Sequence, residues 1–572
     1  MPQTIDATTT MEQLTEQLRT LERRVAALES RDEKPRDLPL PSVPIERPRP
    51  PATWRGFPPV ETPAGAITVI GKAVLGIAGA YLLRALAESP SIPKLPVLII
   101  AILYACFWML WAVRTEAASR FASVTCALTS ALILSPMLWE TTVSFHVLSP
   151  ALASVVLVGF VALTISLAWK RDLQLIPWVA TLSSVGTAIA LIIATQDLVP
   201  LTAALLAIAF TIEVAACLGH RLTLRAIPAV AADFSVWLMV YILTAEALPE
   251  GYHPASAAIL AVLSLALLAI YGGAIAFRTF VKQDRITILE IAQGVAAFAL
   301  ATFGTMRATH SNAGPALGAM FLLLSAACYW GALSRFSDDV HARNRRVFAT
   351  WAAALLLAGS FLLLPANATV IFLSLSSIAA TVVYARTAKL SLGLHASFYL
   401  TAAAAISTLP LYAANALAGT VPSAPDWQIA LVALSALTCS VVGSRHSEDE
   451  IKRRLLWVIP GAVVAFTAAA LVIAAIVAVA APHLVLDASR LSVIRTIVNC
   501  AVALALAFLC SRLRHIELGW LAYTAVAFGT LKLLFEDLRF GNAASLVVSL
   551  LFYGLVLILL PKLTRRPMPE PS

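Results

Sequence analysis

Residues 151–177 read ALASVVLVGFVALTISLAWKRDLQLIP, and this stretch shows how most of the chain is organised. Residues 151–169 contain no charged side chain, and Lys170 and Arg171 follow them directly. As a helix, an apolar segment of this length crosses a hydrocarbon core of about 30 Å. Basic residues directly after such a segment are typical of the cytoplasmic end of a transmembrane helix. We therefore interpret 151–169 as a membrane span.

The same pattern repeats from Ala64 to Leu560, with most gaps too short for an extramembrane domain. We predict about 18 transmembrane helices in antiparallel hairpins, at 64–86, 95–113, 121–138, 151–169, 175–194, 200–218, 227–247, 255–276, 286–306, 315–333, 347–364, 368–385, 392–413, 427–443, 456–481, 491–510, 518–536 and 543–560. Charged residues make up only 13% of the chain, whereas soluble domains contain about 25%. The expected fold class is therefore an all-α, polytopic helical membrane protein.

Lys and Arg residues alternate between the gaps. Numbered in chain order, the even gaps and the C-terminal tail hold 24 of them, whereas the odd gaps and their borders hold five: Arg84, Lys94, Arg307, Arg490 and Arg539. Because positive charge stays on the cytoplasmic side, we expect both termini in the cytoplasm and the protein in the bacterial inner membrane. Topology and anionic headgroups then explain the net charge of +9, so we expect membrane lipids, and not nucleic acid, as partners.

Two segments precede the spans, and a short tail follows them. Residues 1–33 form a predicted amphipathic helix, whose positions 11–28 repeat apolar residues with the spacing of a coiled-coil seam. This helix pairs with a second copy or a protein partner, or it stays a single solvated helix. Residues 34–63 are rich in proline and predict a semi-extended linker. The transmembrane domain is expected over 64–561, with a basic cytoplasmic tail over 562–572.

Charged side chains inside predicted spans mark candidate sites, because an unpaired charge costs about 2.5–3.5 kcal/mol at mid-helix. Glu213, Asp233 and Glu290 fall towards the predicted cytoplasmic ends of their spans, and Gln293 shares a helix face with Glu290. If these spans adjoin, their polar groups form a cation or proton site. The alternative is that a hydroxyl, a backbone group or a basic loop residue satisfies each carboxylate.

A second group lies towards the predicted outer side, where its basic members break the charge rule. It comprises Arg84, Arg495, Asn499, Lys532, Glu536 and Asp537. One interpretation is structural: Arg84, Arg495 or Lys532 forms buried ion pairs with Glu536 or Asp537. The other is a ligand-binding pocket for an anion such as a lipid phosphate or a sugar phosphate.

Motifs of catalysis and of metal binding are missing from the sequence. There is no phosphate-binding G-x-x-x-x-G-K-[ST] loop, no G-x-S-x-G elbow and no H-E-x-x-H motif. Of nine histidines only His395 lies within a predicted span, and the seven cysteines form no C-x-x-C pair. We therefore expect no enzymatic activity, no metal and no cofactor. Pro136, Pro365 and Pro410 lie within or just after spans, where proline kinks or ends a helix.

Both ends of the chain carry sequence features that occur together in one family. Residues 18–29 read LRTLERRVAALE and precede the proline-rich linker, and the first span begins with IGKAVLG at 70–76. Near the end, residues 531–538 read LKLLFEDL, followed by a last span and the basic KLTRR at 562–566. This layout resembles the large bacterial membrane proteins called domain of unknown function 2339. The resemblance implies the architecture and draws attention to Lys532 and Asp537, but it implies no activity.

Two functions remain open. A transporter, or a protein that handles lipids or lipid-linked precursors, needs a polar cavity near the midplane and a moving element; the large number of spans favours this interpretation. The alternative is a membrane scaffold or envelope-organising protein that acts through its N-terminal coiled coil. The small number of charges inside the spans and the short outer loops favour that alternative.

Overall fold

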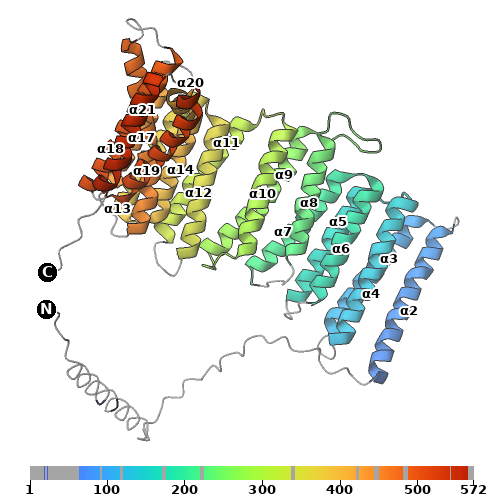
Figure 1. Cartoon of the computed structure of the whole chain (residues 1–572). Helices are drawn as coiled ribbons and strands as arrows, with labels where there is room; N and C mark the ends of the chain where they lie inside the picture. The colour runs from blue at the N-terminus through green and yellow to red at the C-terminus, as the bar shows by residue number, and fades with distance from the viewer. Residues whose placement is uncertain are drawn as a thin grey trace. The chain divides into compact units, whose positions relative to one another are not determined.

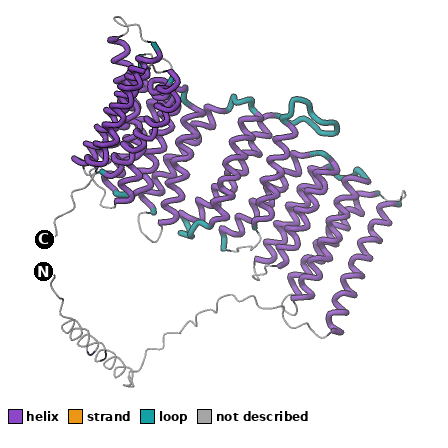
Figure 2. Tube along the Cα trace, in the orientation of Figure 1, coloured by secondary structure: helices purple, strands orange, loops and turns teal. Residues whose placement is uncertain are grey.

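The computed structural model describes Arg19, Glu22 and residues 63–89, 93–115, 120–169, 175–219, 225–336, 342–419, 424–443, 450–480, 487–513, 515–540 and 543–564. Helices dominate these residues, and short loops connect them (Figure 2). Apart from Arg19, Glu22 and Pro63, the predicted coil and linker lie outside the described residues. The last helix ends at Thr564, so the first three residues of the predicted tail continue that helix.

The helices follow one another in chain order (Figure 1). The first are α2 (Pro63–Glu88), α3 (Lys94–Thr115), α4 (Arg120–Trp139), α5 (Pro150–Trp169), α6 (Leu175–Thr195), α7 (Leu198–Cys217) and α8 (Ala226–Leu243). The next are α9 (Ala257–Phe280), α10 (Ile288–Ala308), α11 (Gly314–Trp330), α12 (Ala342–Leu363), α13 (Ala366–Thr387) and α14 (Leu390–Ile406). The last are α15 (Leu409–Ala418), α16 (Trp427–Gly443), α17 (Glu450–Ala480), α18 (Ala488–Leu513), α19 (Ile516–Lys532), α20 (Leu538–Phe540) and α21 (Ala543–Thr564).

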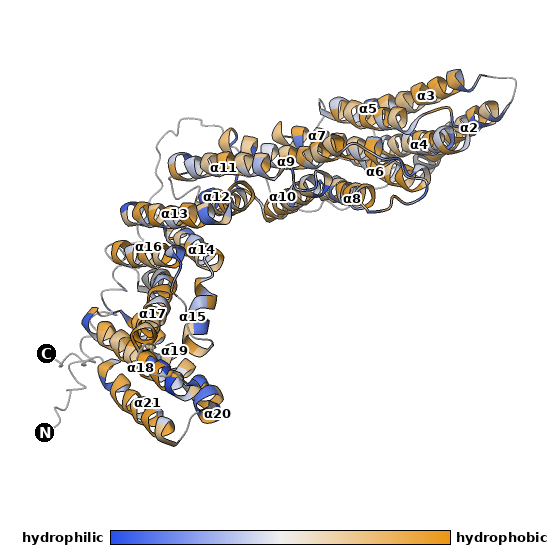
Figure 3. Cartoon of the chain, turned by 90° about the horizontal axis from the view of Figure 1, so that it is seen from above, coloured by the Kyte–Doolittle hydropathy of each residue, from blue (hydrophilic) through white to orange (hydrophobic). Residues whose placement is uncertain are grey.

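The helices match the predicted spans closely. Within the described residues, 16 helices are long and apolar enough to cross a membrane, and Figure 3 shows that most of their residues are hydrophobic. The other two predicted spans differ in form: 392–413 is the helix pair α14–α15, bent by 64°, and 427–443 is the 17-residue helix α16. The prediction of an all-α, polytopic membrane protein is confirmed, and the chain is a multi-pass membrane protein.

The break between α14 and α15 has a local cause. Thr408 lies between the two helices with φ +56°, a left-handed conformation that is unfavourable for a β-branched side chain. Pro410 follows in the first turn of α15, where its missing N–H is tolerated but would interrupt a continuous helix. The proline therefore begins a second helix at a bend instead of kinking one long helix.

Three spans end in a π-helical turn: η1 (Glu140–Ser144) after α4, η2 (Gly331–Arg335) after α11 and η4 (Leu533–Asp537) after α19. A π-helical turn widens the helix by one residue and is frequent at functional sites. In η1 and η4 this turn carries the acidic residues Glu140, Glu536 and Asp537. Both turns therefore place carboxylates near the ends of membrane spans.

Helices α11 and α12 pack closely where two glycines face each other. A Cβ atom on Gly318 would lie 2.7 Å from the backbone nitrogen of Leu363 and 2.9 Å from the carbonyl oxygen of Gly359. A Cβ atom on Gly359 would lie 2.8 Å from the carbonyl oxygen of Gly318. Because the opposing atoms belong to the backbone, they cannot rotate away as a side chain would. Small residues thus allow this helix contact.

We predict that Gly318→Ala lowers the free energy of unfolding by about 1–3 kcal/mol, because the added methyl group must push the two backbones apart. Thermal unfolding in detergent micelles measures the loss. Gly159→Ala on α5 is the matched control, since a Cβ atom there meets nothing within 4 Å. Equal stability of the two variants would contradict close backbone packing at Gly318.

Candidate functional site

The first polar group lies at the end of α19. We call Arg495, Lys532, Glu536 and Asp537 the C-terminal charge cluster. Arg495 comes from α18, Lys532 ends α19, and the two carboxylates belong to η4. Arg495, Lys532 and Asp537 are 2%, 4% and 1% exposed. Two positive and two negative charges are thus buried together with a formal net charge of zero.

Arg495 binds both this cluster and the end of the half-helix α15. Its Nε donates to the carbonyl of Ala416 at 2.8 Å, and its Nη2 donates to the carbonyls of Asn415 and Gly419 at 3.2 and 2.8 Å. Its Nη1 donates to Glu536 Oε1 at 2.7 Å. The last carbonyls of a helix lack partners within the helix, so the guanidinium satisfies them. We call this arrangement the Arg495 clamp.

Lys532 and Asp537 form the second half of the cluster. The Lys532 ammonium forms an ion pair with Asp537 and donates to the carbonyl of Ser492 and to Thr496 Oγ1, each at 2.9 Å. Asp537 accepts hydrogen bonds from both hydroxyls, Ser492 Oγ and Thr496 Oγ1. Lys532 also lies 3.6 Å from Glu536 Oε2. The ion pairs between the predicted basic and acidic residues are therefore formed, and α18 supplies the hydroxyls that complete them.

Two residues predicted for this group lie elsewhere. Asn499 is on α18, but its side-chain amide donates to the carbonyl of Ala525 on α19 at 2.9 Å and so contributes to helix packing. Arg84 forms ion pairs with Glu88 and Glu140, not with Glu536 or Asp537. The prediction that included Arg84 is wrong, because sequence shows that a charge needs a partner but not which helix supplies it.

The second polar group joins α7, the start of α8, α9 and α10. We call Glu213, Arg225, Arg278 and Glu290 the middle charge cluster. Arg278 contacts Glu213 at 3.1 Å and Glu290 at 2.7 Å, whereas Arg225 contacts Glu290 at 2.7 Å and Glu213 at 4.0 Å. A small cavity of about 20 Å³ borders the cluster, which is room for about one water molecule. Each carboxylate thus has an arginine partner.

Asp233 and Gln293 form a separate pair beside the middle cluster. The Gln293 amide donates to both carboxylate oxygens of Asp233, each at 2.9 Å. Glu290 lies one turn from Gln293 and also caps α10, since it accepts from the backbone N–H of Thr287 at 2.8 Å. Structural roles therefore account for the geometry of all four predicted residues, while the ion-site or proton-site hypothesis stays a prediction.

Sequence reasoning missed Arg225 and Arg278 because both were assigned to loops. The structure extends α9 to Phe280, beyond the predicted end at 276, and this places Arg278 in its last turn. A signal was present: Arg278 follows the predicted span by less than one helical turn, so a longer helix would bring its guanidinium back to the membrane end. An arginine near the end of one span is thus a possible partner for a carboxylate in another span.

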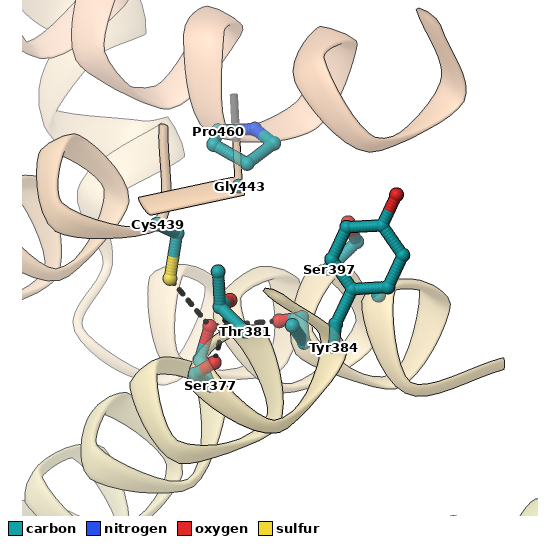
Figure 4. A pocket seen from close by; sticks show the side chains of 9 residues that line it. Ser377, Thr381, Tyr384, Ser397, Cys439, Gly443 and Pro460 are labelled. Carbon is teal, nitrogen blue, oxygen red and sulfur yellow. Dashed lines mark hydrogen bonds between the residues drawn. The ribbon is translucent and has the colours of Figure 1, made fainter. Parts of the chain in front are cut away.

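The third polar group is a pocket between α13, α14, α16 and α17 (Figure 4). Ser377, Thr381 and Tyr384 line it from α13, and Ser397 lines it from α14. Cys439 lies opposite, with its Sγ 3.3 Å from Ser377 Oγ. The pocket has a volume of about 20 Å³, or room for about one water molecule. Its hydroxyl and thiol groups, with no charged residue in the lining, suit an uncharged polar group.

Further polar groups surround this pocket. Ser374, one turn before Ser377, and Ser440, next to Cys439, have buried hydroxyls that make no hydrogen bond within the described part of the chain. On α14, His395 Nδ1 lies 2.9 Å from the hydroxyl of Tyr329. Buried hydroxyls without partners are costly. This region of the membrane domain is therefore more polar than packing alone requires.

The pocket and the Arg495 clamp lie at opposite ends of the α14–α15 pair. The pocket contacts the first half of α14 through Ser397, whereas the clamp binds the last turn of α15. Lys389 precedes α14 just outside the span; burial lowers the pKa of its ammonium, and the positive charge of Arg345 lowers this pKa further. The pocket thus lies near a basic end of the helices, and the clamp lies near the other end.

Comparison with known proteins finds no family model, no curated protein and no solved structure that matches this chain. The resemblance to domain of unknown function 2339 therefore stays a prediction, and the chemistry of these three polar groups carries the functional argument.

Proposed function

We propose that this protein is a transporter for a small, uncharged polar solute, with the α14–α15 pair as its moving element. The observation that carries the proposal is the connection within this pair. One of its ends lines the hydroxyl-rich pocket, the other is held by the Arg495 clamp, and a 64° break lies between them. Transporters commonly use such discontinuous helices to bind and to move solutes.

The chemistry of the clamp suits a switchable contact. Four hydrogen bonds from one guanidinium hold α15, and the Glu536 carboxylate compensates the charge of Arg495. Loss of that carboxylate weakens the hold, since hydrogen bonds to charged partners contribute about 1.5–3 kcal/mol each. The left-handed Thr408 at the break stores backbone strain, and such strain clusters at elements that switch. The geometry therefore supports two positions for α15.

The predicted orientation gives the proposal a direction. With both termini in the cytoplasm of a bacterial cell, the pocket near Lys389 faces the cytoplasmic side and the Arg495 clamp lies near the outer side. The pocket holds about one water molecule in this state. A solute would need α14–α15 to move away from α13 and α16, which makes the present state a closed one with the outer end clamped.

We predict that Glu536→Gln and Arg495→Gln raise the rate at which N-ethylmaleimide modifies Cys439 by about tenfold, which corresponds to about 1.4 kcal/mol less stabilisation of the closed state. Cys439 lines the pocket and is 6% exposed, so its thiol reports opening. The measurement uses reconstituted protein in which the other cysteines are replaced by alanine. Mass spectrometry follows the modification over time.

The matched control is Arg490→Gln, which removes an arginine from the same helix α18 but outside the clamp, where Arg490 lies 3.9 Å from Asp487. Wild-type modification rates in Glu536→Gln and Arg495→Gln, with both proteins folded, would show that clamp and pocket are not coupled. That result would contradict a moving α14–α15 pair.

Solute flux is tested separately with proteoliposomes and glycerol as the probe. We expect faster glycerol-driven volume changes than in protein-free vesicles. Gly443→Leu should reduce the flux, because a Cβ atom there points to Thr381 at 3.7 Å in the pocket wall. Flux equal to that of protein-free vesicles for glycerol and for larger polyols would count against this solute class.

The scaffold hypothesis depends on the coiled coil predicted at 11–28, which lies outside the described residues apart from Arg19 and Glu22. No contact within the described residues favours it over transport. Deletion of residues 1–33 separates the two functions: a transporter keeps its flux and its clamp-dependent Cys439 reactivity without the coil, whereas a scaffold loses its partners.

A further inference from the structure

A groove lies between α2 and α4, far along the chain from the pocket and the clamp. Its volume is about 190 Å³, compared with about 20 Å³ for each of the two other pockets. Ile77 and Tyr81 form one wall from α2, and Leu132 and Met137 form the other wall from α4. The walls are mainly apolar and part of them faces the lipid, since Tyr81 is 64% and Leu132 50% exposed. An acyl chain suits such walls.

Close packing of α2 on α3 bounds the groove. A Cβ atom on Gly76 would lie 2.5 Å from the ring of Trp108, and one on Gly79 would lie 2.8 Å from the hydroxyl of Tyr104. The Tyr104 hydroxyl donates to the carbonyl of Gly76 at 3.3 Å. These contacts bring the two helices together at the glycines. Ala80 and Ala101 line the adjoining groove, where their small side chains leave its volume open.

One end of the groove carries one positive and one negative side chain. Arg84 Nη1 lies 2.9 Å from Glu140 Oε1, and both residues line the groove. Arg84 Nε also donates to Glu88 at 3.1 Å. Within the described residues, Arg84 Nη2 and Glu140 Oε2 make no hydrogen bond. The end of the groove thus offers a donor for a phosphate and an acceptor for an ammonium group.

We propose that this groove binds a zwitterionic aminophospholipid, with its acyl chain between α2 and α4, its phosphate on Arg84 and its ammonium on Glu140. The argument is charge complementarity. A headgroup that carries both charges matches both side chains, whereas a net-anionic headgroup gains from Arg84 but is repelled by Glu140 and Glu88. Arginine binds phosphate oxygens through paired donors. The site is independent of the proposed transport function.

Native mass spectrometry of the full-length protein tests this site. Phosphatidylethanolamine and phosphatidylglycerol with identical acyl chains are added in equal amounts to the detergent-solubilised protein. We expect the protein to retain phosphatidylethanolamine about fivefold over phosphatidylglycerol, a ratio that corresponds to about one ion pair. Phosphatidylcholine, whose quaternary ammonium cannot donate a hydrogen bond to Glu140, should be retained less than phosphatidylethanolamine.

Two substitutions separate the headgroup contacts. Arg84→Gln should abolish the preference, and Glu140→Gln should shift it towards phosphatidylglycerol because the repelling carboxylate is gone. Arg307→Gln is the matched control, since Arg307 is an exposed arginine near the end of α10 that bonds Thr244. It should leave the preference unchanged.

A groove-filling pair keeps the test valid if the charge variants fold poorly. Ala80→Phe should reduce retention of phosphatidylethanolamine without changing any charge, whereas Leu75→Phe, at a site 73% exposed on the same helix, should not. Equal retention of all three lipids by the wild type, or a preference that survives both Arg84→Gln and Ala80→Phe, would overturn the proposal. Either result would mean annular lipid without a built site.

Discussion

Lys532→Met lowers the free energy of unfolding by about 3–5 kcal/mol, because it leaves the buried Asp537 carboxylate without its counter-charge. Lys532 and Asp537 are 4% and 1% exposed, so water cannot replace the missing ammonium. Two hydroxyls, from Ser492 and Thr496, still donate to the carboxylate. They stabilise its charge only in part, and this is why we expect a loss at the lower end of the range if the helix can shift and at the upper end if it cannot.

The double variant Lys532→Met/Asp537→Asn tests whether the loss comes from the unpaired charge. We expect it to recover most of the stability, since replacing both members of a buried ion pair is often neutral. Unfolding by denaturant in micelles gives the four free energies of the double-mutant cycle. If the losses of the single variants simply add in the double variant, the two residues do not form the ion pair described here.

Arg278→Gln is expected to cost a similar amount, about 3–5 kcal/mol, for the same physical reason. Arg278 contacts both Glu213 and Glu290, and without it Glu213 retains only Arg225, at 4.0 Å. Glu213 is 6% exposed, so its charge stays buried. Thermal unfolding in micelles and hydrogen exchange of the α7–α10 segment both measure the effect.

Two further variants make this second prediction specific. Arg278→Lys keeps the positive charge but loses the planar fork that reaches two carboxylates, so it should cost less than Arg278→Gln but more than nothing. Arg278→Gln/Glu213→Gln should recover much of the loss. Arg307→Gln, on the exposed side of α10, is the control and should change stability by less than about 0.5 kcal/mol. An equal loss for Gln and Lys would favour side-chain packing over charge as the cause.

The sequence identified the buried charges well and their partners only in part. Hydropathy marks Lys532, Glu536 and Asp537 as unusual because each charge in a span carries a large desolvation cost wherever the span lies. Spacing along α19 also brings Lys532 and Glu536 to one face of a helix. The partner on another helix has no such signal. Arg84 and Arg495 looked equivalent in the sequence, yet Arg495 binds Glu536 and Arg84 binds Glu140.

The polar pocket shows the opposite case, since no single residue in it looks unusual. Ser377, Ser397 and Cys439 are common in membrane helices, where a hydroxyl can bond its own helix backbone. Only the packing of α13, α14 and α16 places them around one volume. The α14–α15 break was visible as Pro410, but the proline did not reveal that Arg495 binds the carbonyls at the far end of α15.

The sequence by itself determined the all-α, multi-pass class and the positions of the membrane helices. This follows because a helix that satisfies its own backbone is the way a single apolar segment crosses lipid, and its length must match the membrane. Tertiary structure alone decided which charges share a cluster, how α15 is held and where the grooves lie. Those features depend on contacts between helices that are distant in the chain, and lipid-facing and helix-facing surfaces are nearly equally apolar.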